Sequence, residues 1–145
     1  MYKHILLPTD GSALSGTAVL HGVALAKVLG AKVTAVTITT PFHVFATDPE
    51  TVTDTAETYK KRVGKSAAKY LKEVKDAADA AGLACTTIHV EHEHPFRAII
   101  DTARENACDL IAMASHGRHG ISAVVLGSET VKVLTHSNIP VLVYR

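Results

Sequence analysis

The sequence has little excess charge and no apolar run long enough to cross a membrane. Its formal net charge is +1 at pH 7, so no long-range attraction to nucleic acid or to anionic membrane is expected. No apolar run approaches the roughly 20 residues of a spanning helix, and no signal peptide is evident, so we expect a cytoplasmic protein. An apolar content of 47% predicts one globular domain over residues 1–145.

Cysteine is also scarce. Cys85 and Cys108 lack the CxxC spacing of metal and redox sites, so we predict that both are reduced packing residues. Histidine is more frequent, and His89, His92 and His94 lie close together. Alternation along a strand would put His92 and His94 on one face and His89 on the other. Because a closed zinc site needs four well-placed ligands, no metal site is predicted in this segment.

Segments typical of strands and helices alternate along the chain. Apolar or β-branched runs predict strands at residues 4–7, 32–40, 84–90, 109–114 and 139–144. Helices are expected to begin near Ser12, Thr55, Pro95 and Ser128. On the helix that begins near Thr55, the apolar spacing predicts buried side chains at Tyr59, Val63, Tyr70, Leu71, Val74 and Ala78. This alternation predicts an α/β fold, with a parallel sheet covered by helices on both faces.

A glycine-rich segment interrupts this pattern after the fourth predicted strand. Gly117 and Gly120 would let the backbone come close to a bound group, because glycine has no Cβ. Gly127 and Ser128 can place free N–H groups and a hydroxyl at a helix N-terminus, where an anion is favoured. These features suit a phosphate group, so a nucleotide is the first ligand predicted.

The spacing of the glycines resembles that of ATP-binding universal stress proteins. Their pattern is Gly, two residues, Gly, nine residues, then Gly followed by Ser or Thr. Here it falls on Ala114, Gly117, Gly127 and Ser128, with Ala in place of the first Gly. Residues 3–12, Lys-His-Ile-Leu-Leu-Pro-Thr-Asp-Gly-Ser, resemble the family's first strand and the acidic turn after it. Residues 138–144 resemble its last strand, so the resemblance spans the chain.

The resemblance implies a particular fold and a particular place for the ligand. The fold would be Rossmann-like, of the adenine nucleotide alpha hydrolase type, with an open five-stranded sheet in the order 3-2-1-4-5. Open α/β sheets bind ligands where the strand order reverses, here between the first and fourth strands. The loops at that point are residues 8–12 and 114–120. ATP would bind there, with Mg²⁺ or Mn²⁺ held mainly by its phosphates.

The same resemblance implies which residues contact the nucleotide. Asp10, beside Pro8 and Thr9, would line the adenosine pocket, although its turn can also cap the next helix. Ile38 matches a position whose backbone groups pair with the adenine edge. Arg118 either reaches a terminal phosphate or stays solvated. The remaining candidates follow the fourth strand or begin the last helix: Met113, Ala114, His116, Gly117, Gly127, Ser128, Glu129 and Thr130.

No residue is predicted to be catalytic. The P-loop pattern and the Gly-x-Ser-x-Gly elbow are absent, and His116 and His119 have no evident orienting partner. A nucleotide pocket without a positioned base supports binding better than fast hydrolysis. We therefore expect a regulatory, stress-linked ATP-binding module with at most slow hydrolysis. A dimeric interaction module that binds no nucleotide stays open, because Ala114 departs from the glycine pattern.

The end of the chain predicts self-association. The segment that begins at Pro140 and ends at Tyr144 has no polar face, and the implied strand order places it at the edge of the sheet. An apolar edge with unpaired N–H and C=O groups favours pairing with another chain. A symmetric homodimer through residues 140–144 is therefore expected.

Overall fold

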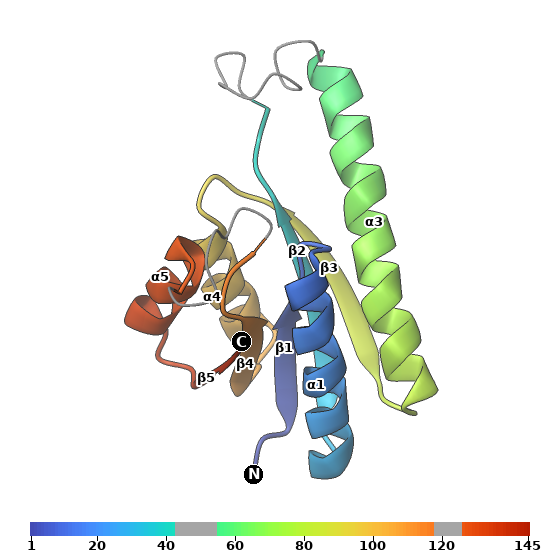
Figure 1. The fold of residues 1–145 in the computed structure, drawn as a ribbon, viewed down its shortest axis with the longest axis vertical. Helices are drawn as coiled ribbons and strands as arrows, with labels where there is room; N and C mark the ends of the chain where they lie inside the picture. Colours follow the sequence, from blue (N-terminus) through green and yellow to red (C-terminus); the bar gives the residue numbers. More distant parts are fainter. Residues whose placement is uncertain (43–54, 118–125) are drawn as a thin grey trace.

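Five parallel strands form the centre of the fold (Figure 1). The computed structural model describes residues 1–42, 55–117 and 126–145. The strands are β1 (His4–Pro8), β2 (Lys32–Thr39), β3 (Cys85–Glu91), β4 (Leu110–Ala114) and β5 (Val141–Tyr144). They lie in the order β3-β2-β1-β4-β5, and each neighbouring pair is parallel. The predicted sheet and its strand order are confirmed.

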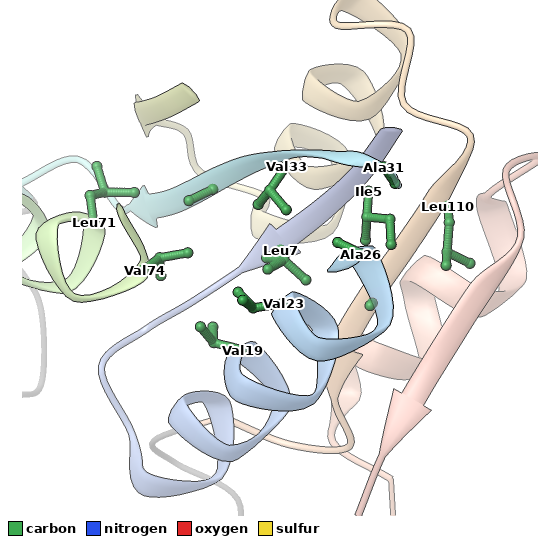
Figure 2. Close-up of a cluster of buried hydrophobic side chains, with 12 residues drawn as sticks. Ile5, Leu7, Val19, Val23, Ala26, Ala31, Val33, Leu71, Val74 and Leu110 are labelled. Carbon is green, nitrogen blue, oxygen red and sulfur yellow. The ribbon is translucent and has the colours of Figure 1, made fainter. Parts of the chain in front are cut away.

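Helices cover both faces of this sheet. They are α1 (Ala13–Leu29) and α3 (Ala56–Ala80) on one face, and α4 (Pro95–Glu105) and α5 (Ser128–His136) on the other. The side chains of β1 alternate between the two faces, since successive strand residues point in opposite directions. Ile5 and Leu7 join the core cluster with α1 and α3, which Figure 2 shows, and Leu6 joins the cluster with α4 and α5.

The ends of the helices lie where the cap residues predict them. Ser12 accepts the N–H of Ser15 at 3.2 Å and begins α1. Gly30 ends that helix in the left-handed region, with a φ of 65°. Thr55 accepts the N–H of Thr58 at 3.1 Å and begins α3. Short-range hydrogen bonds of this kind depend on neighbouring residues alone, which is why the sequence predicted them.

The long helix α3 buries less of its surface than its periodicity predicted. Leu71 and Val74 are buried as expected, but Tyr59, Val63 and Tyr70 are only half-buried, so that part of the prediction was wrong. The first half of α3 extends past the strands (Figure 1). Val63 in this half, and Tyr70 just beyond it, line a cavity instead of the core.

Two histidines near the end of β3 do not lie on the strand as predicted. Strand β3 ends at Glu91, so the alternation predicted for His92 and His94 was wrong, because both lie beyond the strand. Across residues 1–42, 55–117 and 126–145, no group of three or more metal-ligating side chains could hold an ion.

Both cysteine thiols, Cys85 and Cys108, are free, and burial raises the pKa of Cys108 to about 11. Within the same ranges, no helix combines the length and apolarity that spanning a membrane requires.

Candidate functional site

A cavity of about 820 Å³ opens at the carboxyl ends of β1, β2 and β4, beside the point where the strand order reverses. All but one of the predicted site residues line it: Pro8, Thr9, Asp10, Ile38, Met113, Ala114, His116, Gly117, Gly127, Ser128, Glu129 and Thr130. The exception, Arg118, lies outside the described residues. The fold therefore brings four segments to one cavity: the ends of β1, β2 and β4 and the start of α5.

Asp10 connects the loop after β1 with the loop after β4. One carboxylate oxygen accepts the N–H of Ser12 at 2.9 Å, so the predicted turn into α1 is present. A side chain at Gly117 would collide with the other carboxylate oxygen. The glycine at position 117 therefore gives space to Asp10, a role that its spacing in the sequence could not reveal.

Gly127 allows a second close approach between segments. Its N–H donates to the carbonyl of Ser115 at 2.8 Å. A Cβ at position 127 would lie only 2.9 Å from Cβ and 3.0 Å from Cα of His116. The φ of Gly127 is −61°, which any residue can adopt, so the requirement is for space and not for an unusual backbone conformation. Gly127 thus holds the start of α5 against the end of β4.

The first turn of α5 presents backbone N–H groups to the cavity. The N–H of Val131 donates to the carbonyl of Gly127 at 3.0 Å, and this is the first hydrogen bond along the helix. The N–H groups of residues 128–130 therefore have no acceptor within α5. Ser128, Glu129 and Thr130 all line the cavity, so the positive end of the helix dipole lies beside it. This arrangement suits an anion.

Two side chains in this turn make contacts within the protein. The hydroxyl of Thr130 is buried and donates to the carbonyl of Ala114 at 3.1 Å. A carboxylate oxygen of Glu129 accepts the N–H of Phe96 at 2.8 Å, in the first turn of α4. The family resemblance implied that both residues contact the nucleotide from the start of the last helix. The structure adds that their side chains join α5 to β4 and to α4.

The edge of β2 is open beside the cavity because β2 extends past β1. The pairing of the two strands ends at Pro8 with Val36, and the N–H of Thr9 donates to the carbonyl of Val36 at 2.9 Å. Alternate residues of a strand direct their backbone groups to the same side. The N–H and C=O of Ile38 therefore point to the side of β1, beyond the last residue that β1 pairs.

One wall of the cavity was not predicted from the sequence. It comes from α3, through Val63, Ser66, Ala67 and Tyr70. The ring of Tyr70 packs directly on Gly11, whose φ is 76° and which has no room for a Cβ. The spacing of three and four residues along α3 reveals an apolar face, but this pattern does not distinguish a core from a cavity wall.

The fold and the cavity define a class of protein: a Rossmann-like α/β protein with a ligand-sized cavity at the point where the strand order reverses. Comparison with known proteins then identifies the family. The model of the universal stress protein family matches residues 1–145, and the chain belongs to that family.

Individual relatives agree with this assignment. The universal stress protein MJ0531 of Methanocaldococcus jannaschii is 31% identical over 145 residues, which cover 100% of this chain and 83% of that protein. The solved structure of MJ0577, from the same organism, has a TM-score of 0.82 at 28% identity, covering 99% of this chain and 95% of that one. A universal stress protein solved in complex with cAMP has a TM-score of 0.74 at 27% identity, covering 99% and 97% of the two chains.

Proposed function

We propose that this chain binds an adenine nucleotide, with ATP as the form that the glycine pattern indicates, in the cavity between the ends of β1 and β4. The observation that carries the proposal is that one cavity contains both halves of such a site. The N–H groups at the start of α5 suit phosphate, and the apolar side chains of Ile38, Val63 and Met113 suit a base. Its volume of about 820 Å³ is within the usual range for small-molecule sites.

The open edge of β2 suits adenine in particular. The N–H and C=O of Ile38 lie beyond the last β1 pairing, at Val36, and Ile38 lines the cavity. A backbone donor beside a backbone acceptor complements adenine, which carries a ring-nitrogen acceptor next to an amino donor. Guanine presents the opposite order on that edge, a carbonyl acceptor next to an N–H donor. The related structure that contains cAMP supports an adenine nucleotide as the class of ligand.

The proposed role is regulatory and stress-linked. Nucleotide occupancy would change the loops after β1 and β4, which Asp10 and Gly117 bring into contact. Mg²⁺ or Mn²⁺ would be held mainly by the phosphates of ATP. No residue is proposed to be catalytic, and a cytoplasmic location stays a prediction.

We also propose that a second copy of the chain is the partner at β5. Strand β5 lies at the edge of the sheet and pairs only with β4 in the structure described. Its residue Leu142 is 37% exposed, so an apolar side chain lies on an edge strand with unpaired backbone groups, which favours pairing with another strand. Antiparallel pairing of two β5 strands would cover both edges, and light scattering measures that state directly.

Thermal unfolding with nucleotides tests the proposed site. At 100 times its dissociation constant, a ligand stabilises the folded state by about 2.7 kcal/mol, so ATP with Mg²⁺ should raise the Tm by several degrees and GTP by less. Val63→Trp should abolish the shift, because the indole would fill the cavity from α3. Leu20→Trp is the matched control, since Leu20 is 64% exposed on α1 and does not line the cavity. No shift with any nucleotide at millimolar concentration would favour the dimeric interaction module.

A further inference from the structure

The side chain of Glu129 is held between the starts of two helices. It belongs to the first turn of α5, and its Oε2 accepts the N–H of Phe96 at 2.8 Å in the first turn of α4. Its Oε1 accepts a hydrogen bond from the ammonium group of Lys132 at 3.1 Å. Glu129 also lines the cavity. A negative charge is therefore held beside the N–H groups that suit a phosphate.

The cavity has more acidic than basic side chains. Among the lining residues that the structure describes, the acidic ones are Asp10 and Glu129, and none is Lys or Arg. Lys132 pairs with Glu129 but does not line the cavity, and its side chain is 47% exposed. In the described part of the site, attraction for phosphate therefore comes from backbone dipoles, and two carboxylates oppose it.

We infer that Glu129 is a specificity-determining residue that limits how much phosphate charge the cavity accepts, a role that rests on the proposed nucleotide site. ATP carries about two more negative charges than AMP, so the carboxylate repels it more strongly. A divalent cation bound to the phosphates cancels most of this repulsion. With Glu129 charged, the cavity binds free ATP more weakly, relative to AMP, than it would without this charge. ATP that carries a divalent cation is still accepted.

A purely structural role for Glu129 leads to a different result. Glu129→Gln keeps an oxygen that can accept the N–H of Phe96 and nearly the same shape, but it removes the charge. Glu129→Ala removes both the charge and the contact. If Glu129 only joined α5 to α4, the Gln variant would behave as the unmodified protein, and the Ala variant would bind AMP and ATP more weakly by equal factors.

Isothermal titration with AMP and ATP, in excess EDTA and again in excess MgCl₂, distinguishes these roles. In EDTA, Glu129→Gln should lower the dissociation constant of ATP divided by that of AMP about tenfold. The reason is that the two additional phosphates of ATP no longer face a carboxylate. In MgCl₂ the change should be less than about threefold. Glu57→Gln is the matched control. Glu57 is also in the first turn of a helix, pairs with Lys61 at 3.4 Å and does not line the cavity.

Each outcome supports or overturns the role of Glu129. A ratio that falls in EDTA for Glu129→Gln and not for Glu57→Gln supports it. A ratio that stays within about twofold of the unmodified protein, or that falls equally for Glu57→Gln, overturns it while the nucleotide site stands. If the unmodified protein binds neither AMP nor ATP, the proposed function fails, and the role of Glu129 fails with it.

Discussion

The two ends of the central strands use their polar groups in opposite ways. At the amino ends, several polar groups bond to one another: His4 Nε2 lies 2.7 Å from the hydroxyl of Thr34, and the Asp109 carboxylate accepts the N–H groups of Lys3 and His4. At the carboxyl ends, the strands and loops surround a cavity of about 820 Å³. One end is closed by the protein's own hydrogen bonds, and the other leaves room for a ligand.

The lengths of neighbouring strands account for this difference. At the amino end, β1 and β2 begin together, with His4 opposite Lys32. At the carboxyl end, the pairing with β1 stops at Val36 while β2 continues to Thr39. The unpaired edge of β2 faces the space between the loops after β1 and β4. Uneven strand ends therefore create the site, and even strand ends close the opposite side.

The largest expected effect is at the carboxyl ends, for Gly127→Val. The new Cβ would lie 2.9 Å from Cβ of His116, so the side chain would press on that residue and separate α5 from β4. Nucleotide affinity should fall at least about hundredfold, and the free energy of unfolding by about 1–3 kcal/mol, as is typical for overpacking. Titration calorimetry and denaturant unfolding measure the two effects. The control is Gly64→Val in α3, where a Cβ meets nothing within 4 Å, and equal losses in both variants would contradict the contact with His116.

The next effect concerns the closed end, at Cys108. Burial raises the pKa of this thiol from 9.0 to about 11, so its thiolate fraction at pH 8 should be about hundredfold lower than in the unfolded chain. In a Cys85→Ser variant, a thiol reagent should therefore modify the native protein at least about hundredfold more slowly than the protein in denaturant. Cys85 is only half-buried, and the Cys108→Ser variant should react faster when native. Similar native rates for the two thiols would show that the amino end is open.

The smallest effect is a dependence of stability on pH through His4. Burial, and then the positive charge of Lys32, lower the pKa of His4 below 6.5 in the folded state. Below pH 6.5 the unfolded chain therefore binds more protons than the folded one. The stabilisation is present above pH 6.5 and is lost as the pH falls through the folded pKa, with a slope of at most about 1.4 kcal/mol per pH unit. The Asp109 carboxyl stays ionised in both states in this window: an ordinary Asp pKa already lies below it, and in the folded state the N–H groups of His4 and Lys3 outweigh burial and lower the pKa further.

Denaturant unfolding between pH 5 and pH 7.5 measures this slope. His4→Gln should flatten it, since the amide can still bond to Thr34 and does not titrate. His21→Gln is the control, because His21 is exposed and stacks on Tyr144. An unchanged slope in the His4 variant would mean that its ring is not shielded from solvent.

The predictable part of the fold consists of local signals. Ser12 and Thr55 cap helices through N–H groups three residues away, and Gly30 ends α1 in a conformation that favours glycine. The strand order and the place of the cavity came from the family resemblance and not from periodicity. Two of the three errors on α3 have one physical cause: Val63 and Tyr70 follow the apolar period of that helix, and the period is the same for a core face and for a cavity wall.

The order of helices and strands and the caps of α1 and α3 could be predicted from the sequence, because they depend on neighbouring residues. The segments that meet at the candidate site followed from a spaced motif and the family that it resembles. The roles of several of those residues depend on contacts that form only in the folded protein. Gly117 makes room for Asp10, Gly127 packs on His116, and Ile38 has a free edge because β1 is shorter. Glu129 reaches Phe96 across 33 residues of sequence. Such contacts depend on how helices pack on strands, and no local pattern encodes that packing.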